Sequence, residues 1–132
     1  MREILFRGKT DKGEWVEGFY CGKVNKTIFS PAEDSAQIID KNLYWHEVIP
    51  ETVGQYTGLT DKNDKKIFEG DIIKGSWETI LTIFFDEISS SYRVKTSTGH
   101  EREPSYYGIE KFEVIGNIHD NPELLAGGDC NG

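Results

Sequence analysis

The sequence predicts an all-β domain, and three observations support that assignment. Short runs rich in β-branched and aromatic residues recur along the chain, turn-forming residues separate them, and strong helical periodicity is absent. A chain of 132 residues fits one domain of ordinary size. Its composition, 36% hydrophobic and 29% charged, is typical of a globular protein rather than a disordered one.

The predicted strands follow one another from the first residues to the last. In order, they span residues 3–7, 14–20, 26–30, 36–40, 43–48, 71–75, 77–86, 91–96 and 111–119. The run from Ile80 to Phe85 is apolar on both faces except for Thr82, as in a central strand. Polar residues 86–91 follow it and predict a hairpin with the run 91–96. The segment 97–105 reads as an exposed loop.

The last run alternates between two faces. Phe112, Val114 and Ile118 fall on one face and Lys111, Glu113, Asn117 and His119 on the other, while Gly116 marks a bulge or a close approach. Helix is expected only in residues 121–126, where Asn121 can cap and Pro122 occupies the first helical position. The sequence therefore predicts at most a short C-terminal helical turn.

The segment QYTGLTDKNDKKIFEGDII, residues 55–73, is interpreted as a turn between two strands. Asp61 can accept hydrogen bonds from backbone amides two residues on, and Asp64 can take the left-handed position that closes the turn. The similar stretch TDKGEWVEG, residues 10–18, predicts the same turn built from Asp11 and Gly13. One physical arrangement would then be used twice.

The same segment is rich in oxygen-bearing side chains, so metal binding and catalysis are alternative interpretations of it. A calcium loop that starts at Asp61 fails, because Lys65, Lys66 and Ile72 occupy positions that require oxygen ligands or glycine. Glu69 and Asp71 would share one face of a strand, roughly 7 Å apart, which is loosely compatible with an inverting glycosidase pair. Gly70 between them more simply allows a bend.

No catalytic residue, cofactor or metal is predicted elsewhere. The nucleophile-elbow, phosphate-loop and dinucleotide motifs are missing from the sequence. His46, His100 and His119 lack ligand spacing, and Cys21 and Cys130 are expected to be reduced thiols. A site assembled by folding from distant acids, histidines or cysteines remains an alternative.

Charge and aromatic content bear on partners. The net charge is −8, and residues 61–132 carry eight Lys/Arg against fourteen Asp/Glu. No more than two basic residues are adjacent, so direct nucleic-acid binding is not favoured and a basic protein partner fits better. Acidity is also a common means of keeping a protein soluble, and this is the simpler explanation of the charge. No apolar run approaches 18 residues, so we expect no membrane association and a cytoplasmic location. The many aromatic residues are expected to fill the core and a subunit interface; a stacking platform is the alternative.

Three stretches together resemble one family. MREILFRGK, QYTGLTDKNDKKIFEGDIIK and FEVIGNIHDNPELL occur in this order and resemble the YopX family of phage and prophage proteins over essentially the whole chain. Asp64 stands where that family usually has glycine. The family-motif residues, expected to be structural, are Tyr56, Gly58, Asp61, Asn63, Glu69, Gly70 and Asp71. The resemblance implies a complex, partly barrel-like all-β fold, a tendency to form homo-oligomers, and no established catalytic residues.

These expectations combine into one description. A single YopX-like β domain covers residues 1–126, with N-terminal strands in 1–55, an SH3-like barrel-like half in 56–126, and a flexible tail in 127–132. The expected function is that of a non-enzymatic, homo-oligomeric macromolecular binding protein whose partner is a host or phage protein. A nucleic-acid-associated accessory protein of phage replication or regulation is the alternative, and a hydrolase built from distant acids is a third hypothesis.

Overall fold

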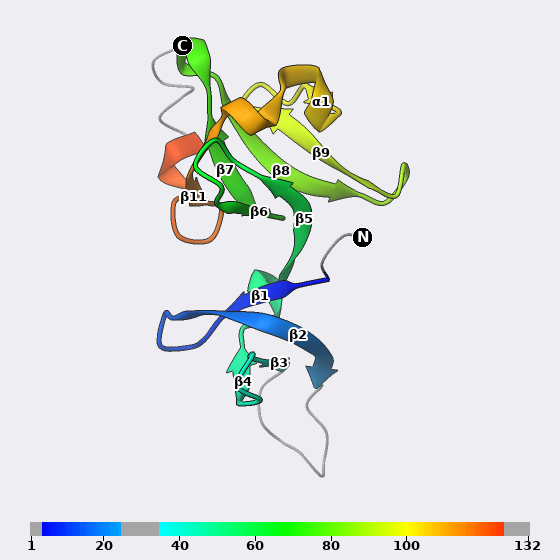
Figure 1. Ribbon diagram of the computed structural model, residues 1–132, viewed down its shortest axis with the longest axis vertical. Coiled ribbons are helices and arrows are strands. Elements are labelled where there is room, and N and C mark those ends of the chain that lie inside the picture. Colours follow the sequence, from blue (N-terminus) through cyan, green and yellow to red (C-terminus); the bar gives the residue numbers. More distant parts are fainter. Residues whose placement is uncertain (1–3, 25–34, 126–132) are drawn as a thin grey trace. The chain divides into compact units, whose positions relative to one another are not determined.

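The computed structural model describes residues 4–24 and 35–125, and the chain divides into two compact units, Met1–Tyr56 and Thr57–Gly132. Strands dominate both units, so the all-β class is confirmed (Figure 1). The predicted strand 26–30 and the tail 127–132 lie outside the described residues. The domain limits expected from the sequence stay a prediction.

The first unit is an antiparallel sheet. Its strands are β1 (Phe6–Lys9), β2 (Trp15–Val24), β3 (Ser35–Ile39), β4 (Trp45–Val48) and the first residues of β5 (Gly54–Thr60), in the order β4-β3-β2-β1-β5. A 3-10 turn, η1 (Pro50–Thr52), connects β4 to β5. Ala36, Ile38 and Val48 are buried together on one face of this sheet, with Phe6 and Val16 packed against them.

The second unit holds the remaining elements. Its strands are β6 (Lys66–Phe68), β7 (Asp71–Lys74), β8 (Ile80–Asp86), β9 (Ser91–Thr96), β10 (Glu101–Arg102) and β11 (Glu113–Asn117). Between them lie η2 (Ser76–Glu78), the helix α1 (Pro104–Tyr107) and η3 (Ile109–Lys111). The five-stranded sheet has the order β10-β9-β8-β7-β11, with all neighbours antiparallel.

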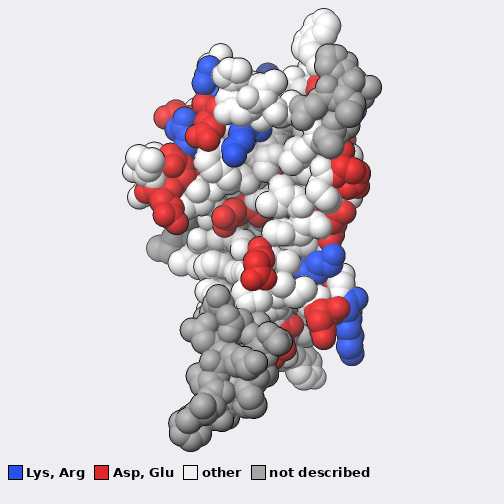
Figure 2. Space-filling model, turned by 180° about the vertical axis from the view of Figure 1, so that it is seen from behind, with Lys and Arg blue, Asp and Glu red and all other residues white. Residues whose placement is uncertain are grey.

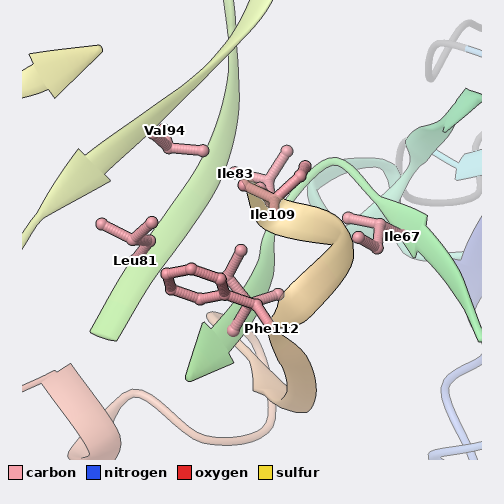
Figure 3. Close-up of a cluster of buried hydrophobic side chains, with 7 residues drawn as sticks. Ile67, Leu81, Ile83, Val94, Ile109 and Phe112 are labelled. Carbon is pink, nitrogen blue, oxygen red and sulfur yellow. The ribbon is translucent and has the colours of Figure 1, made fainter. Parts of the chain in front are cut away.

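The core of the second unit draws on segments from most of its length. The buried cluster consists of Ile67, Ile73, Leu81, Ile83, Val94, Ile109 and Phe112. Figure 3 shows Leu81 and Val94 on the sheet strands with Ile109 and Phe112, from the segment after α1, gathered over them. The chain after α1 thus covers this face of the sheet before it becomes β11.

Several predictions of local structure are confirmed. β8 pairs with both β7 and β9, as expected of a central strand, and residues 86–91 turn the chain into the β8–β9 hairpin. The segment 55–73 contains β5, a turn and β6, which confirms a turn between two strands. β11 pairs with β7, as the expected closing strand would. Closure of this half into an SH3-like barrel is not confirmed.

Other local predictions were wrong. The predicted strand start at 77–79 is a 3-10 turn in which Trp77 and Glu78 have φ of 61° and 57°. The segment 97–105 is exposed as expected except for the half-buried Pro104, but it is not all loop, because it contains β10 and the start of α1. Pro104 lies in the first helical turn, a position that proline favours. The C-terminal turn is present at residues 123–125, but the side-chain oxygen of Asn121 accepts from the N–H of Asn117 instead of capping it.

The bulge predicted at Gly116 is confirmed, and it overturns the face assignment beyond it. The register between β11 and β7 shifts between Val114 and Gly116. Because a bulge inserts one extra residue, it reverses the alternation of side chains downstream. Asn117 is consequently buried, with 8% of its surface exposed, whereas Ile118 is 39% exposed.

One tight turn recurs in both units. The first residue donates its N–H to the carbonyl four residues on, its side-chain oxygen accepts the N–H of that same residue, and its carbonyl accepts from the residue three on. The residues in this first position are Thr10, Asp40, Asp61 and Thr96. The left-handed residues that close the turns are Gly13, Leu43, Asp64 and Gly99, with φ between 63° and 93°. The predicted repetition is therefore found, but Thr10 and not Asp11 corresponds to Asp61.

Gly70 provides a test of the bend between β6 and β7. Its φ is 91°, its N–H donates to the carbonyl of Ile83, and its carbonyl accepts from Ile118. We expect Gly70→Val to abolish the native fold, because backbone strain of about 1–3 kcal/mol adds to the displacement of both hydrogen bonds. The measurement is a thermal melt followed by circular dichroism.

Gly99 is the matched control for this substitution. Its φ is 93°, and a Cβ there would meet nothing within 4 Å. Gly99→Val should therefore carry the strain alone and lower the melting temperature without unfolding the protein. A native-like melt for Gly70→Val would contradict the importance assigned to the bend.

Candidate functional site

Asp61 is the central residue of the motif segment, and its carboxylate is occupied by the backbone. The side chain is only 4% exposed. Oδ1 accepts from the N–H groups of Asn63 at 2.8 Å and Lys65 at 2.9 Å, and Oδ2 accepts from the N–H of Val114 at 3.0 Å. Two of these bonds form the turn, and the third joins it to β11. The carboxylate thus serves the local turn and a distant strand at once.

The electrostatics of Asp61 follow from these contacts. Burial alone would raise the pKa of its carboxyl, but the N–H donors of Val114, Lys65 and Asn63 favour the charged form. The nearby Lys65 cation acts in the same direction, so the pKa of Asp61 lies below its ordinary value of 3.8. Asp61 is therefore ionised at neutral pH, with its oxygens already satisfied by backbone donors.

The Glu-Gly-Asp part of the motif forms the bend into β7. Asp71 is 1% exposed, and its Oδ2 accepts from the N–H of Phe68 at 2.7 Å. Glu69 is half-buried. Glu69 and Asp71, the two acids of the possible catalytic pair, thus differ in burial. The hydrogen bond from Phe68 to Asp71 stabilises the bend between β6 and β7.

The remaining motif residues occupy different surroundings. Tyr56 is buried, with 7% exposure, and Asn63 is exposed, its N–H donating to Asp61. Gly58 has a φ of 89° within β5. Next to it, the hydroxyl of Thr57 donates to the carbonyl of Ile67 in β6 at 2.8 Å. The hydrogen bonds of Asn63 and Thr57 are thus made within the fold, one inside the turn and one between β5 and β6.

The described histidines, cysteines and acids form pairs at most, and none of their groupings has the size of a metal site. Within residues 4–24 and 35–125, no three His, Cys, Asp or Glu side chains are grouped so that they could hold a metal ion. His46 pairs with Asp40, Nε2 to Oδ2 at 2.8 Å, and this hydrogen bond is the main reason that the pKa of Asp40 is lowered. His100 contacts the hydroxyl of Thr98. Cys21 is an exposed free thiol, and Cys130 lies outside the described residues.

A cleft in the second unit was not predicted from the sequence. It has a volume of about 420 Å³. The lining residues are Leu59, Ser91, Tyr92, Glu103, Pro104, Ser105, Ile109 and Glu110. They come from the end of β5, the start of β9, the α1 region and η3. Apolar side chains, two serines, a tyrosine and two glutamates thus line one cleft.

A row of three large apolar side chains, two aromatic and exposed with a half-buried isoleucine between them, crosses the sheet of the first unit. Phe19 in β2 lies opposite Ile39 in β3, and Ile39 lies opposite Trp45 in β4. Residues directly opposite one another share a face, so these three form the aromatic row. Phe19 is 63% and Trp45 64% exposed, whereas Ile38, on the other face, is fully buried. The row is therefore a surface feature of the sheet.

The expectation that the aromatic residues fill the core is right for only part of them. Tyr56 is buried, and Trp15, Tyr92 and Tyr107 are half-buried. Four others are largely exposed: Tyr44, Trp45, Trp77 and Tyr106. Tyr44 and Trp45 are neighbours in sequence, and contiguous exposed aromatic surface, unlike single exposed residues, is typical of interaction sites.

The fold and the motif geometry define an all-β protein in which a carboxylate turn is tied to a closing strand. The family model for YopX protein matches residues 5–126, and the chain belongs to the YopX family. Protein EF1440 from Enterococcus faecalis has a similar crystal structure, with a TM-score of 0.52, 23% sequence identity, and coverage of 95% of this chain and 99% of that one. At this identity the likeness concerns the fold alone. A comparison with curated proteins finds no match.

One further structural observation concerns membranes. In the part of the chain that the structure describes, no helix is both long enough and apolar enough to cross a membrane.

Substitution of Asp61 tests its structural role. Asp61→Ala would leave three backbone N–H groups without their acceptor, so we expect a loss of about 3–5 kcal/mol in the free energy of unfolding. Asp61→Asn keeps one side-chain oxygen as an acceptor but places the NH₂ group of the amide against the N–H of Val114, where two donors face each other. We expect this variant to lose about 2 kcal/mol in the free energy of unfolding. Urea unfolding measures both, and Asp11→Ala, at an exposed position, should change little. Equal stability of Asp61→Ala and the wild type would refute this role.

The pH dependence provides a second readout of the same residue. Because the pKa of Asp61 is lowered in the folded state, its stabilising contribution is fully present above 3.8 and is lost as the pH falls through the lower, folded value. The stability difference between wild type and Asp61→Asn should therefore shrink upon acidification below this value.

Proposed function

We propose that this protein is a non-enzymatic macromolecular interaction protein that acts as a homo-oligomer, is cytoplasmic, and derives from a phage or prophage. The observation that carries the proposal is the aromatic row of Phe19, Ile39 and Trp45 on the sheet of the first unit. Large aromatic side chains that lie exposed on a sheet face favour association with another surface.

The composition of the row matches that of protein interfaces. Burying a Phe or Trp side chain removes about 150–250 Å² from water, and such residues are enriched among those that dominate binding energy. Leu43 and Tyr44, in the turn before β4, add further exposed apolar surface at 75% and 67% exposure. A stable interface buries about 800 Å² on each partner, so residues around the row would have to take part as well.

A second candidate function is that of a nucleic-acid-associated accessory protein. Exposed aromatic side chains can stack on bases, and Arg102 lies over the exposed ring of Tyr106 at 5.3 Å. The net charge of −8 opposes this candidate. On the face visible in Figure 2, Lys and Arg side chains are interspersed with Asp and Glu rather than gathered into a basic patch.

Self-association through the aromatic row can be tested by light scattering coupled to size-exclusion chromatography. The wild type is expected to show a concentration-dependent oligomer, and Phe19→Ser/Trp45→Ser should be a folded monomer, because both side chains are mostly exposed. Its melting temperature should match that of the wild type at a concentration at which the wild type is dissociated, because association itself stabilises the folded state. The matched control is Trp77→Ser in the second unit, where Trp77 is 97% exposed. A wild type that stays monomeric, or a double variant that stays oligomeric, would count against the proposal.

The interaction partner can be sought by tagged capture from phage-infected host lysate, with and without nuclease, followed by mass spectrometry. We expect a host or phage protein to be retained after nuclease treatment and to be absent from captures with an acidic control protein of equal charge. Recovery that disappears with nuclease would instead favour the nucleic-acid candidate.

A further inference from the structure

We propose that the cleft of the second unit binds a basic segment of a protein partner. An apolar side chain of that segment would lie between Leu59, Tyr92 and Ile109, and a flanking Lys or Arg would pair with Glu103 or Glu110. The inference deepens the proposed function and rests on it, in that it names the chemistry of the partner. It does not depend on self-association through the aromatic row.

The floor of the cleft is apolar and belongs partly to the packed core. Ile109 is 4% exposed and belongs to the core cluster of the second unit, and Tyr92 packs against that cluster and against the ring of Phe85 at 5.2 Å. Leu59 and Pro104 complete the apolar lining, with Leu59 41% exposed at the surface. Because the floor is part of the packed core, a ligand meets a preformed surface and little ordering opposes binding.

The size of the cleft fits a short peptide segment. A volume of about 420 Å³ exceeds that of any single side chain and lies within the range of ligand sites, about 300–1,000 Å³. The hydroxyls of Ser91 and Ser105 also line it, and each can donate and accept hydrogen bonds with a peptide backbone. One apolar side chain with its flanking backbone therefore matches both the space and the polar groups.

The charge of the cleft selects a basic ligand. Its lining residues include the carboxylates of Glu103 and Glu110 and no Lys or Arg. Three cations adjoin lining residues in sequence: Arg93, Arg102 and Lys111. None of them lines the cleft, and Arg102 donates to the carbonyl of Glu101 and lies over the ring of Tyr106. Residues 57–132 as a whole hold eight Lys/Arg against fourteen Asp/Glu. This field attracts cations and repels phosphate, so it favours a basic protein segment over nucleic acid.

The test is an amide NMR titration of the full chain with synthetic peptides. The probes are Gly-Arg-X-Arg-Gly peptides with Leu, Phe or Trp at X. We expect saturable shifts confined to the cleft, at the amides of Leu59, Ser91, Tyr92, Ser105 and Ile109, that weaken as salt is added. Peptides with Glu in place of Arg, or with Ser at X, should bind at least tenfold more weakly. No saturable shift in the cleft with any of the three probes, or equal binding of the acidic peptides, overturns the proposal.

Variants separate the charge contribution from the apolar one. Glu103→Gln/Glu110→Gln removes two exposed carboxylates and should weaken binding by about four- to tenfold, in line with surface ion pairs. Leu59→Ser should weaken it by a similar factor. The control, Glu14→Gln/Glu51→Gln, removes the same charge from exposed positions of the first unit and should leave the affinity unchanged. An equal loss for the control would show that net charge alone drives binding and would refute the cleft.

The outcome is separable from that of the self-association test. Phe19→Ser/Trp45→Ser should leave the peptide affinity of the cleft unchanged, and the cleft variants should leave the oligomer unchanged. A wild type that stays monomeric would therefore contradict self-association but not peptide binding by the cleft. An absence of peptide binding would contradict the cleft proposal but not self-association.

Discussion

The buried carboxylate of Asp61 is the interaction on which the second unit depends. It accepts three backbone hydrogen bonds, two within its own turn and one from Val114, which lies 53 residues further along the chain. The N–H of Lys62 donates to the carbonyl of Phe112 beside it. One ionised side chain thus fixes the β5–β6 turn and places the start of β11, whose pairing with β7 completes the sheet. Hydrogen bonding to the backbone therefore explains the aspartate at position 61 without a bound ion.

The bend at Gly70 joins the same two regions from the other end of β6. Its N–H bonds to β8 and its carbonyl accepts from Ile118, just after β11, while the Asp71 carboxylate accepts from Phe68 at the end of β6. Ile67 and Phe112 meet in one core cluster between these attachments. The segment that carries Phe112 also carries Ile109, which forms part of the cleft floor. The motif segment therefore supports the cleft from below and also contributes one side chain, Leu59, to its lining.

What the sequence predicted depends on how local each determinant is. The turn at Asp61 and Asp64, the hairpin from β8 to β9, and the bulge at Gly116 were predictable because the residues that cause them are neighbours in sequence. Ile118 was misassigned because a bulge reverses alternation, which a fixed period of two ignores. The cleft could not be predicted, since Leu59, Tyr92 and Ile109 come from segments that only the fold brings together. The aromatic row required the strand register, which composition does not supply.

The two proposed surfaces differ in chemistry, and this difference has a functional consequence. The aromatic row lies on the first unit and suits contact with another apolar surface, whereas the cleft lies on the second and suits a basic segment. A single rim ion pair contributes at most about 1 kcal/mol, so one cleft alone binds weakly. An oligomer formed through the row would present several clefts at once, and a partner with repeated basic segments would then bind by avidity, with each later contact occurring at high effective concentration. Self-association would in this way convert a weak, charge-selective cleft into a specific binding surface, without any catalytic chemistry.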